Sequence, residues 1–258
     1  MQYLARVSVT LGTTLLVFAL SGSALAQVVV PSVPGSSNLY LAGMPNGSTC
    51  CGGDTAPAQS PVQVTGLTLT AGSTLTFTAT GGVNNSGGTP TTGPDGGSLQ
   101  ATPANNGISG ATWPINALVG VFLDASQPSL SAAPASLDFT TTNFTTLSPQ
   151  LKQAFFIGDG LTGTGTGTAQ TFIVPAGATR LFLGTTDGFQ WSNNSGSFAV
   201  VVTAGAAGVT PTPTVPAPTL TPTATAGPAP NVPTLSFPML ALFGLALATA
   251  AMLLMRRP

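Results

Sequence analysis

VQVTGLTLTAGSTLTFTAT, residues 62–80, is the clearest indication of how this chain folds. Apolar residues alternate with threonine on both sides of the Ala71-Gly72 pair, as in Leu75-Thr76-Phe77-Thr78-Ala79. A period of two is typical of strands with one buried face, and β-branched threonine favours extended backbone. The stretch therefore predicts two strands, residues 62–70 and 73–80, joined by a turn.

Similar short apolar runs follow, separated by Gly, Asn and Pro. We expect further strands at residues 117–123, 170–174, 179–184 and 197–203, and one short helix near residues 148–154, where Pro149 fits a first turn. Many short strands with such turns are typical of an all-β domain, an antiparallel β-sandwich or jelly roll. This domain is expected to span residues 62–208, after a loosely ordered, Gly/Ser/Pro-rich lead-in at residues 27–61.

The composition excludes most catalytic machinery, because the chain has no His and all six of its acidic residues are Asp. We therefore predict a protein that is not an enzyme. The enzymatic alternative would have to use a pair of Asp or an Asp-bound metal. Away from the chain ends only Lys152 and Arg180 are basic, too few to neutralise a run of phosphates, so nucleic acid is not expected as a partner.

The two cysteines, Cys50 and Cys51, are adjacent. A disulfide between neighbours closes a small ring and cannot tie distant segments together. Three states stay open for the pair: free thiols, a vicinal disulfide, or an intermolecular or redox contact.

The N-terminal end carries a targeting pattern. Arg6, an apolar run at residues 11–20, and the small residues Ala24 and Ala26 before Gln27 predict a signal peptide at residues 1–26. We therefore expect the protein to be exported, with Gln27 as its first mature residue.

The C-terminal end is organised as a stalk followed by a hydrophobic span. Residues 209–231 are rich in Pro and Thr, a composition that favours extended polyproline II and cannot bury a core. Residues 237–255 carry no charge, and a helix of that length would cross roughly 30 Å of hydrocarbon. Arg256 and Arg257 follow and are expected to stay cytoplasmic, which places the preceding chain outside the inner membrane.

The short motif Val232-Pro233-Thr234-Leu235-Ser236 comes just before this span. Together with the helix and the terminal arginines, residues 232–258 resemble the IPTL-type branch of the PEP-CTERM sorting signals. The resemblance implies recognition by an exosortase-type membrane protease, which removes the helix on the way to the cell surface or its polysaccharide matrix. Val232 stands where the family has Ile, so a plain single-pass anchor remains the alternative.

The stretch with the most chemistry is LFLGTTDGFQWSNNSGSFAV, residues 181–200. A strand delivers Asp187 into a tight loop, which returns through Asn193 and Asn194 into the last strand. One carboxylate and two amide oxygens would then converge, and Ca²⁺ prefers such oxygen ligands in flexible geometry. The alternative is a plain turn, since Asn and Gly tolerate positive φ.

This stretch resembles the C-terminal part of the LecA (PA-I) galactose-binding lectins, and residues 75–82, 93–96, 117–121 and 172–184 recur in the same order. The resemblance implies a small β-sandwich of the galactose-binding-domain type in which Ca²⁺ bridges loop residues and sugar hydroxyls. It assigns the metal to Asp187, Asn193 and Asn194, with Asn85 near a backbone-carbonyl ligand. Sugar contacts would come from Asp187 and Asn193.

Trp191 lies inside this loop and is the better of two tryptophans for stacking on a sugar ring. The loop from Asp187 to Asn193 is one residue shorter than the family pattern, and the family's His-Pro sugar-contact loop has no counterpart. Galactose specificity is therefore not carried over. We expect a non-catalytic surface or matrix protein that binds carbohydrate through a calcium-supported loop. The alternative is a structural surface protein in which calcium only stabilises the loop.

Overall fold

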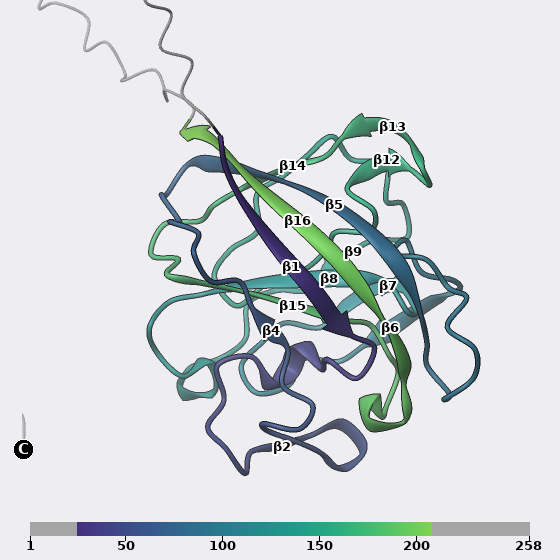
Figure 1. Ribbon diagram of the computed structural model, residues 1–258. Coiled ribbons are helices and arrows are strands. Elements are labelled where there is room, and N and C mark those ends of the chain that lie inside the picture. Colours follow the sequence, from purple (N-terminus) through teal and green to yellow (C-terminus); the bar gives the residue numbers. More distant parts are fainter. Residues whose placement is uncertain (1–24, 208–258) are drawn as a thin grey trace, which may run out of the picture. The chain divides into compact units, whose positions relative to one another are not determined.

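The computed structural model describes residues 25–207, and this part of the chain is all-β, with only short 3₁₀ helices besides its strands (Figure 1). Most of the predicted signal peptide (1–26), the Pro/Thr-rich linker (209–231) and the sorting signal (232–258), with the motif Val232–Ser236 and the membrane span 237–255, lie outside the described residues. Within residues 25–207 no helix is long and apolar enough to cross a membrane.

The strands are short apart from three, β1, β5 and β16. In chain order they are β1 (Ala26–Pro34), β2 (Thr49–Cys50), β3 (Asp54–Thr55), β4 (Val62–Gln63), β5 (Ser73–Asn84), β6 (Leu99–Thr102), β7 (Ala111–Pro114), β8 (Leu118–Leu123), β9 (Leu137–Asp138), β10 (Thr146–Leu147), β11 (Ala154–Phe156), β12 (Leu161–Gly163), β13 (Thr166–Ala169), β14 (Thr171–Ile173), β15 (Arg180–Thr185) and β16 (Ser195–Ala207). The 3₁₀ helices are η1 (Leu39–Leu41), η2 (Cys51–Gly53), η3 (Pro128–Leu130) and η4 (Trp191–Asn193).

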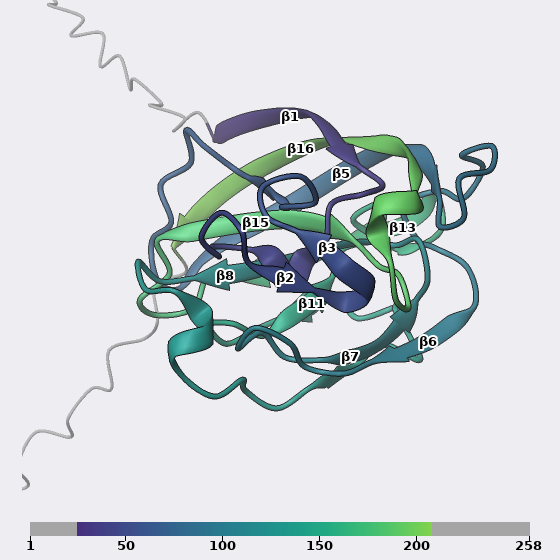
Figure 2. The same ribbon diagram turned by 90° about the horizontal axis from the view of Figure 1, so that it is seen from below.

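Two larger sheets form the framework. One has the strand order β1-β16-β5-β14-β10 and the other β11-β8-β15-β4, and smaller sheets are made by β6-β7-β9, β12-β13 and β2-β3. Neighbouring strands are antiparallel except in the pairs β10–β14 and β7–β9. Figure 2 shows the β1-β16-β5 layer on one side of β8 and β15, with β6 and β7 on the other.

The alternating pattern places one face of the β5–β16 pair in the core. Leu75 and Phe77 of β5 are buried, as are Phe198, Val200 and Val202 of β16, while the intervening threonines and alanine are partly or fully exposed. The antiparallel register pairs Val202 with Phe77 directly. A period of two therefore generates the buried face, as residues 73–80 and 197–203 predict.

The middle layer is buried on both faces. Every residue of β8 is buried, because the larger sheet covers one side and η1 and the β6-β7-β9 sheet approach the other. Gly184 of β15 shows how close the covering chain lies: a Cβ there would come within 2.7 Å of Ser37 O and 3.3 Å of Leu39 N. Only glycine allows this approach.

The predicted strand at residues 62–70 is wrong in its extent, and the two strands around Gly72 belong to different sheets. Gly72 does turn the chain, with φ of 76°, but β4 belongs to the β11-β8-β15-β4 sheet and β5 to the other large sheet. Only residues 62–63 of the first segment form a strand. The chain thus changes sheets here, because β5 gains a much longer partner in β16.

The expectation of a loosely ordered lead-in at residues 27–61 is also wrong. β1 pairs with β16 along most of its length, and Leu39, Tyr40 and Leu41 of η1 are fully buried. The prolines of this segment conceal the strand in the sequence, yet β1 is an edge strand, where a missing N–H is tolerated. The lead-in is therefore part of the core.

The short helix expected near residues 148–154 is absent. Residues 151–152 form a turn in which Gln153 N–H donates to Gln150 O, and Ala154 begins β11. Lys152 has a φ of 64°, which no α-helix contains. Its N–H donates to Phe122 O, so the segment follows the neighbouring strand instead.

Candidate functional site

The segment between β15 and β16, residues 186–194, is called here the Asp187 loop, and it begins at a fixed position. Thr186 Oγ1 donates to Pro114 O (2.6 Å) and accepts from Ala117 N–H (2.8 Å). The preceding Thr185 donates through Oγ1 to Gly35 O (2.6 Å). The start of the loop is thereby tied both to the chain before β8 and to the lead-in.

Asp54, from the lead-in, holds the middle of the loop. Its Oδ2 accepts from Trp191 N–H (2.9 Å) and from Asn38 Nδ2 (2.9 Å), and its Oδ1 accepts from Ser192 N–H (3.0 Å). The residue is fully buried. A carboxylate with this many donors is a structural clamp on the loop, because every hydrogen bond compensates the loss of water. Sequence reasoning missed Asp54, since no local motif marks it.

The Trp191 ring is buried, whereas the sequence-based prediction of sugar stacking requires an exposed ring. Its side chain is 1% exposed, its Nε1 donates to Thr185 O (2.8 Å), and its ring meets that of Tyr40 edge-on, with centroids 6.0 Å apart. A buried tryptophan usually finds an acceptor for its N–H, as Trp191 does here. Trp191 is therefore the buried hydrophobic residue of the loop.

Asp187 is a buried carboxylate with one free oxygen. Its Oδ1 accepts from the backbone N–H groups of Gly188 and Phe189, whereas its Oδ2 is buried without a hydrogen-bond partner. Burial raises the pKa of Asp187 above its ordinary value of 3.8. The N–H groups of Gly188 and Phe189 and the amide of Asn194 oppose this rise, and the charge of Asp54 adds to it.

No cation of the described chain neutralises Asp187. Lys152 and Arg180 are the two basic residues within residues 25–207. Lys152 Nζ is bound by Ser131 and Ala132, and the Arg180 guanidinium by the carbonyls of Asp124 and Ser126. The negative charge of the Asp187 loop is therefore left without a protein partner.

Asn194 and Asn193, although adjacent, are placed differently. Asn194 Nδ2 donates to Gly35 O (3.0 Å), which fixes the amide so that Oδ1 is buried without a donor. The Asn193 side chain is exposed. Of the two asparagines, Asn194 is therefore the one whose side chain is partly buried and lies beside Asp187.

Asn85 reaches the same corner through the β5–β16 ladder. Asn84 pairs with Ser195 at the end of these strands, so Asn85 and Asn194 leave the ladder together. Asn85 Oδ1 accepts from Asn116 Nδ2 (3.1 Å). The side-chain oxygen of Asn85 is thus occupied, which leaves its backbone carbonyl as the group that could face a metal.

Asn116 is a further member that sequence reasoning missed. It is buried, and its φ of 65° is one that asparagine tolerates better than most residues. Its backbone N–H donates to Thr186 O (3.0 Å), next to Asp187. Its Oδ1 is buried without a donor. The only feature of the sequence that could have indicated Asn116 is its position directly before the predicted strand at residues 117–123.

Three buried side-chain oxygens on residues in or bonded to the Asp187 loop therefore lack donors, and we call them the oxygen cluster: Asp187 Oδ2, Asn194 Oδ1 and Asn116 Oδ1. In the described residues only two other buried side-chain atoms lack a partner, Trp113 Nε1 and Gln170 Oε1. Each such group costs about 1–3 kcal/mol. A cation with a preference for oxygen would relieve the cost of each of these oxygens that it contacts.

The oxygen cluster has no nitrogen or sulfur ligand to offer. Within the described residues no group of three or more His, Cys, Asp or Glu side chains could hold a metal ion. A metal here would depend on one carboxylate, neutral amide oxygens and backbone carbonyls. These are calcium ligands, and they fit zinc poorly.

Comparisons with known proteins add no identity to this geometry. No family model matches the chain, and no curated protein or solved structure shows significant similarity to it.

Proposed function

We propose that this protein is a non-catalytic carbohydrate-binding protein of the cell surface or extracellular matrix, in which a Ca²⁺ ion at the Asp187 loop supports the binding site. The observation that carries this proposal is the oxygen cluster. The proposal includes a β-sandwich of the galactose-binding type, formed by the two larger sheets. Calcium would be held by Asp187, Asn194, Asn116 and the backbone carbonyl of Asn85.

Calcium suits these groups better than the other common divalent ions. Mg²⁺ requires near-ideal octahedral geometry and gives up its water reluctantly, whereas Ca²⁺ accepts six to eight oxygens in flexible arrangements. A single coordinating carboxylate implies a weak site, with a Kd of about 10⁻⁴–10⁻³ M, as in extracellular modules. Such a site fills only where free calcium is abundant, which is outside the cell.

Export is the second part of the proposal and rests on the chain ends. A signal peptide at residues 1–26 and exosortase-type processing near residues 232–236 would deliver the protein from the inner membrane to the surface. The bond between Cys50 and Cys51 supports an oxidising location, because disulfides are rare in the cytosol. β1 begins at Ala26, one residue before the proposed mature N-terminus.

One observation favours a second candidate function, a structural surface protein with a calcium-stabilised loop. Asp187 is 6% exposed and Asn116 is 5% exposed. Ligands this deeply buried leave little room for sugar hydroxyls to complete the coordination of the ion. In that case calcium would stiffen the Asp187 loop without touching any ligand.

Two measurements on the purified full-length protein test the proposal. The first is isothermal titration with CaCl₂ of the wild type, Asp187→Asn and the control Asp138→Asn, whose exposed carboxylate caps a turn at Thr140 N–H. We expect heat of binding for the wild type and the control, and none for Asp187→Asn. The second is a glycan array with calcium or EDTA. Calcium binding with no retained glycan would select the structural function, and no calcium binding would refute the metal site.

A further inference from the structure

We propose that the pocket between η2 and the Asp187 loop binds one uncharged pyranose ring, with the Cys50–Cys51 disulfide and the Phe189 ring as its apolar wall. We call it the Cys51 pocket. This inference rests on the proposed carbohydrate binding, and it names the place and the ligand class. It also separates the sugar from the calcium ion, which the burial of the oxygen cluster requires.

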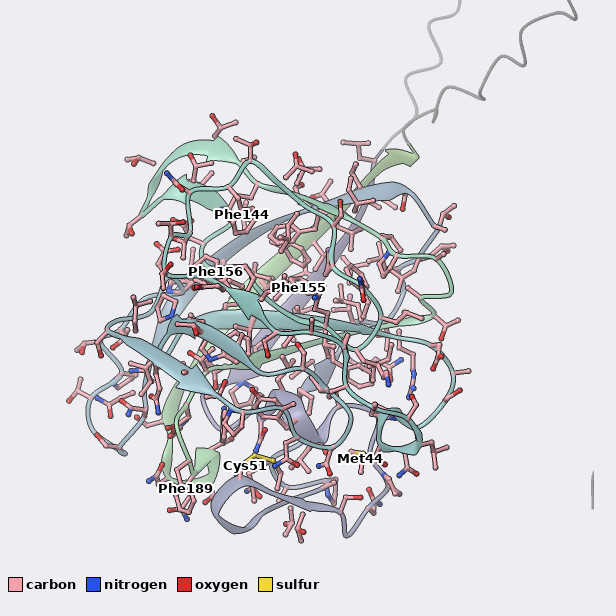
Figure 3. The ribbon with its side chains drawn as sticks, turned by 180° about the vertical axis from the view of Figure 1, so that it is seen from behind. Met44, Cys51, Phe144, Phe155, Phe156 and Phe189 are labelled. Atoms are coloured by element: carbon pink, nitrogen blue, oxygen red, sulfur yellow. A yellow bond between two sulfur atoms is a disulfide. The ribbon has the colours of Figure 1, made fainter. Side chains whose placement is uncertain are left out.

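The pocket is assembled from four segments that are distant in the sequence. Tyr40 comes from η1, Cys51 from η2, Thr102 and Asn105 from β6 and the turn after it, and Phe189 and Trp191 from the Asp187 loop. Figure 3 shows Cys51 and Phe189 together at one end of the molecule. The cavity measures about 200 Å³, below the ~300–1,000 Å³ typical of drug-sized ligands, so it suits a single ring.

Phe189 has a large apolar side chain that is exposed, and its packing in the fold gives no reason for this exposure. Its side chain is 69% exposed, although most large apolar side chains of the domain are buried. The ring lies directly over η2: a Cβ on Gly52 would be 3.0 Å from two of its ring carbons. An aromatic face held open beside a disulfide presents the flat apolar surface against which the C–H face of a pyranose packs.

The remaining wall carries neutral hydrogen-bonding groups. None of the lining residues is charged, and burial raises the pKa of Tyr40 to about 12, which keeps its hydroxyl protonated. Thr102 Oγ1 donates to Ala111 O (3.3 Å), so in the pair Tyr40 Oη–Thr102 Oγ1 (2.8 Å) the proton comes from Tyr40. Tyr40 Oη is left with a lone pair to accept from a sugar hydroxyl.

The part of the pocket lined by Asn105 is held in place by a second asparagine. Asn106 Nδ2 donates to Tyr40 O (3.0 Å), and so fixes the Asn105–Ile108 turn against η1. Asn105, half-buried at this rim, offers both an amide donor and an amide acceptor. An apolar face on one side and neutral donors and acceptors on the other match a neutral sugar, and they disfavour an anion or a metal.

The pocket is linked mechanically to the calcium loop. Asp187 Oδ1 accepts from the backbone N–H of Phe189, so the residue that would hold calcium also positions the ring. Calcium is therefore expected to increase sugar affinity by ordering Phe189, without contacting the sugar.

The test uses neutral methyl pyranosides (gluco, galacto and manno) as probes. Their binding to the full-length protein in the presence of calcium is measured by saturation-transfer NMR. The variants are Phe189→Ala and Asn105→Ala, and the control is Leu130→Ala, an equally exposed apolar side chain (76%) on η3. We expect at least one pyranoside to bind the wild type and the control. Phe189→Ala should weaken it on the order of tenfold, because one stacking face is lost.

The outcomes separate this inference from the function on which it rests. Glycan binding that is unchanged in Phe189→Ala and Asn105→Ala but lost in Asp187→Asn would overturn the Cys51 pocket and leave the calcium-supported lectin standing. Failure of every pyranoside and every arrayed glycan to bind would overturn both. Because Phe189 is exposed, Phe189→Ala should fold, and an unchanged calcium titration would verify this.

Discussion

Replacing a buried acid usually lowers the stability of a protein, but we expect Asp187→Asn not to lower the stability of the calcium-free protein. In the absence of calcium, burial raises the pKa of Asp187, so its charge disfavours folding at neutral pH. Asn has nearly the same shape, keeps an oxygen for the two backbone N–H groups, and carries no charge into the buried position. We therefore expect Asp187→Asn to be at least as stable as the wild type in EDTA.

Calcium should stabilise the wild type more than it stabilises Asp187→Asn. At a free Ca²⁺ concentration of about 10 mM and a Kd of about 10⁻⁴–10⁻³ M, binding to the folded state adds about 1.4–2.7 kcal/mol. For a domain of this size 1 kcal/mol corresponds to about 2–4 °C in Tm, so the wild type should gain about 3–11 °C. Asp187→Asn, which lacks the only carboxylate of the oxygen cluster, should gain almost nothing.

Thermal unfolding followed by circular dichroism in EDTA, CaCl₂ and MgCl₂ measures both effects. Asp138→Asn, the same change at an exposed turn, should behave as the wild type in all three buffers. The reasoning is refuted if Asp187→Asn unfolds at lower temperature in EDTA and gains as much from calcium as the wild type does. Equal stabilisation by magnesium would indicate nonspecific ion binding.

Three further predictions concern pH and the supports of the loop. Because the pKa of Asp187 is raised in the fold, protonation at this residue favours folding. Without calcium, this contribution to stability is fully present below pH 3.8 and is lost as the pH rises through the folded-state pKa. Calcium affinity should rise over the same pH window, and calcium titrations at several pH values would show this. Asp54→Ala leaves three buried donors without an acceptor and should cost at least about 3 kcal/mol in urea unfolding, while Asp54→Asn should cost less; equal losses would contradict the clamp. Tyr40, with a pKa raised to about 12, should keep its full stabilisation below pH 10 and lose up to about 3 kcal/mol between pH 10 and 12, a loss that Tyr40→Phe should not show.

The strand pattern could be predicted for most of β5 and β16, where apolar and polar residues alternate because one face of each strand is buried. Residues 73–80 and 197–203 alternate in the sequence and form the centres of β5 and β16. The partners of these strands were not readable, because alternation says which face is buried and not which strand lies alongside. β1 pairs with β16 across a sequence separation of more than 160 residues. It also contains prolines, which only an edge strand tolerates.

The sequence-based prediction grouped Asp187, Asn193, Asn194 and Asn85 as one metal site. The β5–β16 register places Asn85 and Asn194 just beyond one end of the ladder, whereas the Asn193 side chain is exposed. Asn116 was overlooked because it enters from a different loop. Trp191 was misassigned because sequence cannot distinguish an exposed aromatic ring in a loop from one that fills the space beneath it.

The order of residues along the chain sets the all-β character, because periodicity and turn chemistry act over a few neighbouring residues. It also places Asp187 in a short loop between two strands. Long-range packing decides three other features. It leaves certain side-chain oxygens without donors, it brings Asp54 to the loop that this residue clamps, and it exposes Phe189 rather than Trp191 to solvent. Burial and hydrogen-bond satisfaction are properties of surroundings assembled from distant segments, so they arise only when the chain has folded.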